Sequence, residues 1–139
     1  KKEYLALVFG DFAHPVRARG RLVHDDSSAV AKKKRFLAGD FSENDPCSAD
    51  TELIPLRRFG KDMTLVRAIP HTGRQHQIRA TLFSLGFPLA GDKLYGPDER
   101  IFLKIRSQTI SDADRALLRL PAQALHSERL EFRHPFLNK

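Results

Sequence analysis

Side chains suited to chemistry concentrate between residues 71 and 96. Four hydrogen-bond donors lie close together near the start of this stretch: Arg74, Gln75, His76 and Arg79. Thr72 and Gly73 predict a turn and an N-cap for a helix that begins near Arg74, because a threonine side chain can accept from the first free N–H groups. A helix N-terminus favours anions, and these donors reinforce that preference. The pattern predicts a site for phosphate or carboxylate.

The rest of this stretch predicts the body of the helix. Ile78, Leu82 and Leu85 recur at helical spacing, which gives the helix an apolar stripe for burial. Gly86 favours termination, since glycine adopts the left-handed conformation that ends helices, and Pro88 prevents the helix from resuming. The predicted helix is therefore short and has a basic first turn.

Other kinds of reactive site receive little support. His71 and His76 are five residues apart, which does not place them on one helical face. His126 and His134 lack the spacing of zinc ligands. Cys47 is the single cysteine, so it can form no internal disulfide and has no cysteine partner for zinc. Nucleophile-elbow and glycine-rich phosphate-loop motifs are also absent from the sequence. We expect no metal site.

The charge balance favours an acidic partner. The chain of 139 residues carries a formal net charge of +7. Its basic residues are clustered, most densely in the run Lys32, Lys33, Lys34 and Arg35, whereas many acidic residues gather between residues 39 and 50. Many basic domains bind nothing acidic, but this clustering favours a nucleic acid.

Length and composition set further limits. A chain of 139 residues is the size of one domain, and 41% hydrophobic with 29% charged residues is an ordinary soluble composition. No apolar run approaches the roughly 20 residues that a membrane helix requires, and no signal-peptide pattern is present. With a single cysteine, these features favour a reducing, cytoplasmic setting without a membrane partner.

Apolar and alternating segments predict a sheet. We expect strands over residues 4–9, 16–22, 29–37, 51–59, 63–70 and 124–132. The first is apolar on both faces, as in a central strand. The second alternates, so its three arginines share one face, which we interpret as solvated in preference to an RNA contact. The fourth and fifth form a hairpin around residues 60–62, and Pro55 indicates an edge position or a bulge.

Helices are few in this prediction. Besides the helix near Arg74, Ser111 with Asp114 three residues later resembles a capping box and predicts a helix that ends before Pro121. Residues 39–50 have the composition of a loop. The predicted fold is α+β, with a mixed, mainly antiparallel sheet and few helices.

Three ordered motifs resemble those of the RluA-type pseudouridine synthases. The first, Lys2-x-Tyr4-x-Ala6-x-Val8-x-Gly10, is similar to the family's tyrosine-bearing strand. The second joins Thr72-Gly73-Arg74-x-His76-Gln77-Ile78-Arg79 to Gly86-x-Pro88-x-x-Gly91-Asp92-x-x-Tyr95-Gly96. The third runs from Leu125-His126 to Phe132-x-His134-Pro135. Together they span nearly the whole chain in the family's order, which is more specific than any one of them.

The resemblance implies an isomerase that converts uridine to pseudouridine in ribosomal or transfer RNA, with an aspartate nucleophile and no cofactor. Tyr4 matches the family tyrosine that packs on the extruded base. Arg79 matches the arginine that holds the aspartate ionised, and Leu125 matches the apolar residue of the pocket floor. The expected RNA contacts are Lys32, Lys33, Lys34, Arg35, Arg74, His76 and Gln77.

Each catalytic assignment has a structural alternative. Tyr4 could be a core residue with its hydroxyl bonded to the backbone, and Leu125 would be buried in any strand. Arg79 could form a structural bridge with Asp92. The resemblance favours the functional role for Tyr4 and Arg79.

The family's nucleophilic aspartate lies in an HRLDR-like motif upstream of the tyrosine strand, and the 139 residues contain no such motif. We therefore expect residues 1–139 to be the C-terminal portion of a single catalytic domain, monomeric and inactive by itself. Two functions remain open. The chain is part of a synthase whose nucleophile lies outside it, or it is a non-catalytic RNA-binding module derived from a truncated synthase.

Overall fold

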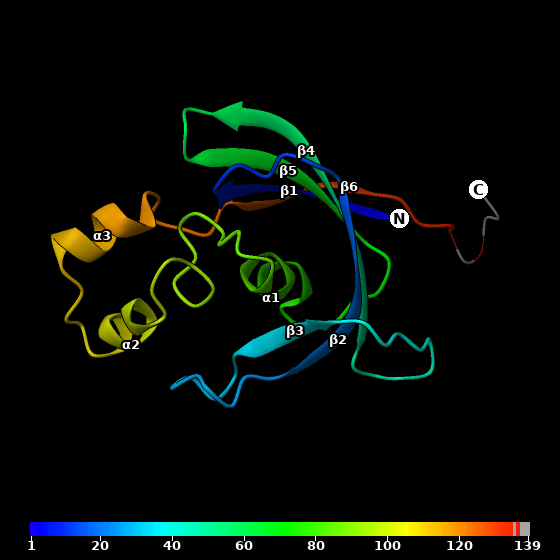
Figure 1. Cartoon of the computed structure of the whole chain (residues 1–139), viewed down its shortest axis with the longest axis horizontal. Coiled ribbons are helices and arrows are strands. Elements are labelled where there is room, and N and C mark those ends of the chain that lie inside the picture. The colour runs from blue at the N-terminus through cyan, green and yellow to red at the C-terminus, as the bar shows by residue number, and fades with distance from the viewer. Residues whose placement is uncertain (135, 137–139) are drawn as a thin grey trace.

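Six strands in one sheet and three helices make up the fold of the described residues (Figure 1). A computed structural model describes residues 1–134 and 136. The strands are β1 (Lys2–Phe9), β2 (Val16–His24), β3 (Lys34–Ala38), β4 (Ser48–Phe59), β5 (Met63–Pro70) and β6 (Leu125–Leu130). The helices are α1 (Gln77–Ser84), α2 (Arg100–Arg106) and α3 (Asp112–Leu118). The sheet order is β3-β2-β4-β5-β1-β6, and each of these neighbouring pairs is antiparallel. The predicted α+β fold with a mainly antiparallel sheet is confirmed.

β1 lies inside the sheet, as predicted, because β5 pairs with one of its sides and β6 with the other. Ala6 and Val8 of this strand are fully buried. The hairpin of β4 and β5 also forms as predicted, with Phe59 opposite Met63. Pairing within it shifts between Pro55 and Arg57, which confirms a bulge. β4 lies between β2 and β5, so the bulge and not an edge position accommodates the proline.

Three predicted starts are wrong by three residues or more. β4 begins at Ser48 and not at residue 51, so it includes the last residues of the predicted 39–50 loop. β3 begins at Lys34 and not near residue 29, because the preceding residues form a turn in which the Lys33 N–H donates to the Val30 carbonyl at 2.9 Å. α1 begins at Gln77 and not near Arg74. The Gln77 side chain accepts from the Arg74 N–H at 2.9 Å and holds the intervening residues in a turn. The N-cap is therefore His76, with a left-handed φ of 60°.

The second half of the chain contains one predicted helix and one that the sequence did not indicate. Ser111 and Asp114 form the expected capping box at the start of α3. α2 was missed because it has neither a side-chain cap nor an acidic first turn. No helix in the described part of the chain is long and apolar enough to cross a membrane. Pro135, which ends the third motif, lies outside the described residues.

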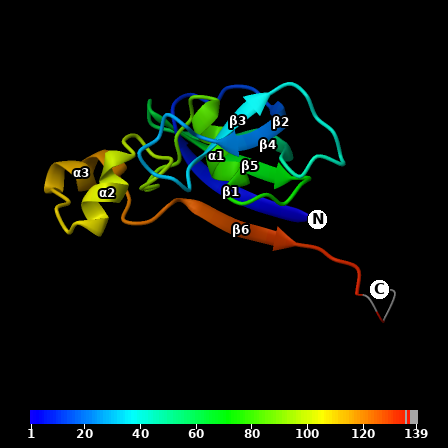
Figure 2. The same cartoon turned by 90° about the horizontal axis from the view of Figure 1, so that it is seen from below.

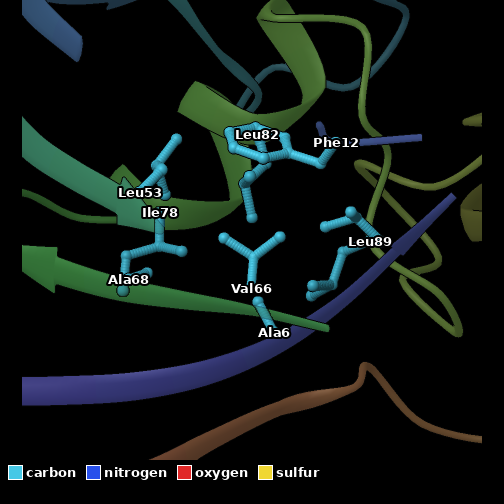
Figure 3. Close-up of a cluster of buried hydrophobic side chains, with 9 residues drawn as sticks. Ala6, Phe12, Leu53, Val66, Ala68, Ile78, Leu82 and Leu89 are labelled. Atoms are coloured by element: carbon cyan, nitrogen blue, oxygen red, sulfur yellow. The ribbon is translucent and has the colours of Figure 1, made fainter. Parts of the chain in front are cut away.

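The sheet curves around α1, which lies on its concave side (Figures 1 and 2). One apolar cluster joins Ile78 and Leu82 of α1 to β1, β4 and β5 (Figure 3). A second cluster joins Ala80 of α1 to β2, β3 and the segment after α1, including Phe36 and Tyr95. Burial on two sides fixes the position of α1 and of the side chains at its N-terminal end.

Candidate active site

A cavity of about 290 Å³ lies at the N-terminal end of α1. Its walls come from β1, the end of β5 and the turn that follows, α1 and the start of β6. They include the three predicted catalytic residues, Tyr4, Arg79 and Leu125, and three of the predicted RNA contacts, Arg74, His76 and Gln77. We call this the α1 cavity. Residues from both ends of the chain meet there.

Strand pairing brings Tyr4 and Leu125 to the same side of the sheet. Tyr4 lies opposite Ala68 of β5, and Leu125 lies opposite Ala6, two residues along β1 from Tyr4. The β1–β6 pairing shifts between Glu3 and Tyr4, and irregularities of this kind redirect the neighbouring side chains. Tyr4 and Leu125 pack against the edge of the first cluster and remain partly exposed. The Tyr4 hydroxyl makes no hydrogen bond within the described residues, so the backbone bond considered from the sequence is not formed.

Arg79 forms a bidentate ion pair with Asp92. Its Nε and Nη2 donate to the two carboxylate oxygens at 2.6 and 2.8 Å. The buried Asp92 carboxylate also accepts the N–H groups of Leu94 and Tyr95, each at 2.9 Å. Burial alone would raise the pKa of Asp92, but the guanidinium and these N–H groups lower it below its ordinary value. The structural bridge is therefore present, and it leaves the Nη1 donors of Arg79 without a partner in the described part of the chain.

Gln77 holds the turn before α1 and does not face solvent. Its side-chain oxygen accepts from the Thr72 hydroxyl at 2.8 Å and from the Arg74 N–H at 2.9 Å. Its amide nitrogen donates to the Asp50 carbonyl at 3.0 Å and to the Thr51 hydroxyl at 2.9 Å. Only 4% of Gln77 is exposed. Its prediction as an RNA contact is corrected, because its amide groups are already bonded within the protein.

His76 is positioned by Tyr95, a residue to which the sequence reasoning gave no role. The Tyr95 hydroxyl accepts the Lys34 N–H at 2.8 Å and lies 3.0 Å from Nδ1 of His76. Burial, followed by the charges of Arg79 and Lys32, lowers the pKa of His76 below its ordinary value. The sequence feature that could have revealed this role is Tyr95 in the second motif, because a buried tyrosine hydroxyl requires a hydrogen-bond partner.

The basic run divides into surface and interior residues. Lys32 and Arg35 are exposed, and Lys34 is partly exposed. Lys33 is only 3% exposed, and its ammonium lies 2.8 Å from Glu99 and 4.2 Å from the Phe83 ring centroid. The prediction of Lys33 as an RNA contact is therefore corrected, because a buried and paired ammonium is not accessible to phosphate.

The α1 cavity offers a flat ring, an apolar wall and cationic donors. None of the described residues that line it carries a carboxylate, a thiol or an aliphatic hydroxyl other than that of Thr72. The Thr72 hydroxyl is engaged with Gln77 and with the Asp50 N–H. The described walls can therefore bind a base and an anion, but they contain no free nucleophile of the carboxylate type.

Comparisons with known proteins agree on one family. Residues 1–84 match the family model described as RNA pseudouridylate synthase. The chain is 49% identical over 139 residues to ribosomal large subunit pseudouridine synthase D of Nitrosomonas europaea. The match covers 97% of this chain and 34% of that protein. It is 36% identical over 139 residues to the dual-specificity RNA pseudouridine synthase RluA of Pasteurella multocida. This match covers 97% of this chain and 52% of that protein.

A solved structure shows the same arrangement of elements. Human RNA pseudouridylate synthase domain containing 1 matches with a TM-score of 0.65 and 26% identity, over 91% of this chain and 46% of that one. The chain thus spans between 34% and 52% of the length of the two sequence relatives. The family model covers more than half of the chain, and the motifs quoted from the sequence meet in the α1 cavity. The chain belongs to the RNA pseudouridylate synthase family, as a member of its RluA type.

Proposed function

We propose that the complete protein is an RNA pseudouridine synthase, and that residues 1–139 form the C-terminal portion of its catalytic domain. The observation that carries this proposal is the meeting of Tyr4, Arg79 and Leu125 in the α1 cavity. Relatives whose names refer to the ribosomal large subunit and to tRNA favour ribosomal or transfer RNA as the substrate. We also propose that the enzyme is a monomer and that it acts in the cytoplasm.

The reaction requires a uridine to leave its stack and enter the cavity. The bond between N1 of uracil and the ribose carbon C1′ breaks, and a bond between C5 and C1′ replaces it. C5 loses its hydrogen as a proton, and N1 gains one. In this proposal the Tyr4 ring supplies the flat partner that an extruded base needs, and Leu125 supplies an apolar wall. The unbonded Tyr4 hydroxyl is available to take or relay a proton.

In this proposal Arg79 binds the nucleophilic carboxylate, which comes from outside the described residues. A carboxylate in a partly dry cavity tends to become protonated and inert, unless a fixed cation keeps it ionised. Asp92 does not serve as this nucleophile in our proposal, because it is fully buried and already accepts four hydrogen bonds. The free Nη1 donors of Arg79 suit a second carboxylate, with Asp92 fixing the plane of the guanidinium.

Further RNA contacts in this proposal come from basic residues in the cavity wall and from the basic run at the start of β3. From the predicted set we retain the residues with accessible side chains: Lys32, Lys34, Arg35, Arg74 and His76. Arg74 is oriented by its Nε, which donates to the Ser48 carbonyl at 3.0 Å and leaves its other donors free. These residues supply the sequence-independent part of RNA binding.

The test is tritium release from ribosomal and transfer RNA labelled at C5 of uridine, with the complete protein. We expect release by the wild type and a loss of about 100-fold or more for Tyr4→Ala, because a misplaced base reacts slowly. Phe59→Ala is the matched control, since Phe59 is an exposed aromatic residue that does not line the cavity. A complete protein that binds RNA without releasing tritium would be the non-catalytic RNA-binding module, and the proposal would fail.

A further inference from the structure

A second cavity, of about 250 Å³, adjoins the α1 cavity. The two share His76 and Arg79 as lining residues, so these side chains form the partition between them. The far walls of the second cavity include Lys32 from the turn before β3, Lys93 from the segment after Asp92, and the Phe102 ring of α2. We call this the lysine cavity.

The charge of the lysine cavity is not neutralised by the protein. Lys33 and Lys104 pair with carboxylates at 2.8 and 2.7 Å. Lys32 and Lys93, by contrast, have no ion pair among the described residues. The Lys32 ammonium lies 4.5 Å from the centroid of the Phe102 ring, which orients it without cancelling its charge. Two uncompensated ammonium groups around one cavity favour an anion inside it.

His76 adds a neutral donor to the same cavity. The Tyr95 hydroxyl accepts the N–H of Lys34. Among the described residues, Nδ1 of His76 is the only acceptor for the hydroxyl's own hydrogen. Nδ1 is therefore the unprotonated nitrogen, and Nε2 carries the hydrogen. Nε2 has no partner in the described part of the chain. The hydrogen bond from the Tyr95 hydroxyl selects this tautomer, and burial, which lowers the pKa of His76, favours the neutral ring, so that Nε2–H can donate to an oxyanion.

Phosphodiester oxygens suit this set of donors. Two ammonium groups and an N–H suit the acceptors of one phosphate. Because the two cavities share His76 and Arg79, a phosphate next to a uridine in the α1 cavity would lie within reach of the lysine cavity. We propose that the lysine cavity binds the backbone phosphate next to the target uridine, through Lys32, Lys93 and His76. The inference rests on the proposed function, because it requires the uridine to occupy the α1 cavity. It adds Lys93 as a specific RNA contact and gives Lys32 a defined partner.

The first test measures how salt weakens the binding of the complete protein to a cytidine oligonucleotide that contains one uridine. Each phosphate contact to single-stranded RNA contributes about 0.7 to the slope of log affinity against log salt. Because the two lysines share one phosphate, we expect Lys32→Gln combined with Lys93→Gln to reduce the slope by about that amount, each single change to reduce it by less, and Lys93→Arg to retain it. Lys61→Gln is the matched control, since Lys61 is exposed and lines neither cavity.

The second test locates the phosphate. A neutral methylphosphonate replaces the phosphate on one side or the other of the single uridine. One of these changes should weaken binding to the wild type and have a smaller effect on Lys93→Gln, in which only Lys32 and His76 still bind the phosphate. Equal losses in the two proteins would overturn the inference.

The outcomes separate this inference from the proposed function. RNA binding with a slope that neither lysine changes would overturn the lysine cavity as a phosphate site and leave the synthase proposal standing. Absence of RNA binding by the wild type would overturn both. Inorganic phosphate serves as a competitor: if it displaces RNA only from proteins that retain Lys93 while the methylphosphonate has no effect, the cavity binds a small free anion and not the RNA backbone.

Discussion

At the residue scale, Arg79 has two tasks in our proposal. It holds Asp92 with Nε and Nη2, and its remaining donors are available to a second carboxylate from outside the described residues. A lysine cannot do both, because its ammonium is a point charge on a flexible stem and not a planar fork. The shape of this side chain therefore matters as much as its charge.

We predict that Arg79→Lys lowers the turnover of the complete protein by about 100-fold, since small displacements at a reacting site have effects of this size. Tritium release measures the turnover, and urea unfolding shows whether the fold persists. Arg100→Lys is the control, because Arg100 also makes a two-donor pair, with Asp98, but on the exposed surface. Normal turnover by Arg79→Lys would mean that Arg79 serves only as a structural bridge.

His76 gives a prediction for stability against pH. Its folded pKa lies below the ordinary value of about 6.5 that it regains on unfolding, so the unfolded chain binds the proton first as the pH falls. The free energy of unfolding should therefore be highest above that unfolded pKa and decline as the pH falls toward the folded one. Urea unfolding between neutral and mildly acidic pH measures this decline.

His76→Gln provides the comparison for this profile. The other histidines are common to both proteins, so the difference between the two stability curves isolates His76. We expect the variant to lose less stability than the wild type on acidification. Superimposable changes in the two curves would show that His76 ionises equally in the folded and unfolded chains.

The sequence located the catalytic candidates but not the exposure of their neighbours. Tyr4, Arg79 and Leu125 could be placed in one site because ordered motifs carry information about residues far apart in the chain. The burial of Lys33 depends on Glu99, which lies 66 residues away, and that of Gln77 depends on Asp50, 27 residues away. Nothing in the local pattern of charge distinguishes Lys33 from Lys32, so only the tertiary contacts could separate them.

At the element scale, side-chain hydrogen bonds override the helical pattern before α1. Periodicity identified Ile78 and Leu82 correctly as buried positions. It could not place the first turn, because Gln77 binds the Arg74 N–H in competition with a helical bond. The positive φ of His76 follows from this turn. It directs the imidazole toward Tyr95 and to the partition between the two cavities.

Gly91 controls how the segment after α1 approaches the chain before β6. Its φ is 71°, and a Cβ atom there would lie 2.0 Å from the Ala122 carbonyl oxygen. We predict that Gly91→Ala destabilises the protein by about 2 kcal/mol or more, since strain at a left-handed residue adds to the backbone clash. Urea unfolding measures this loss.

Gly86→Ala is the matched control for Gly91. Gly86 also has a positive φ, of 87°, but a Cβ atom there would meet nothing within 4 Å. Its substitution should cost about 1 kcal/mol from conformation alone. Equal losses at the two glycines would show that the close approach to Ala122 does not contribute, and that the segment beside Asp92 can move to relieve the contact.

At the scale of the whole molecule, the described residues form a basic binding surface around a site that requires a further group. In our proposal the formal net charge of +7 attracts RNA over the surface as a whole, and the two cavities hold one nucleotide and its phosphate. Among the described residues, Asp92 is the only buried carboxylate beside Arg79, and Arg79 neutralises its charge. We therefore expect RNA binding and catalysis to be separable in this protein.

The last prediction follows from that separation: residues 1–139 alone should release no tritium from uridine-labelled RNA, whereas the complete protein should. Neither the phenol of Tyr4 nor the guanidinium of Arg79 offers a carboxylate oxygen, so neither can replace a carboxylate nucleophile. Changing the aspartate of an HRLDR-like motif to asparagine in the complete protein should abolish release while RNA binding persists, because that substitution leaves both cavities unchanged. Turnover by residues 1–139, or by the asparagine variant, would place the nucleophile within the chain described here, and Asp11 and Asp98 would then be the carboxylates to substitute first.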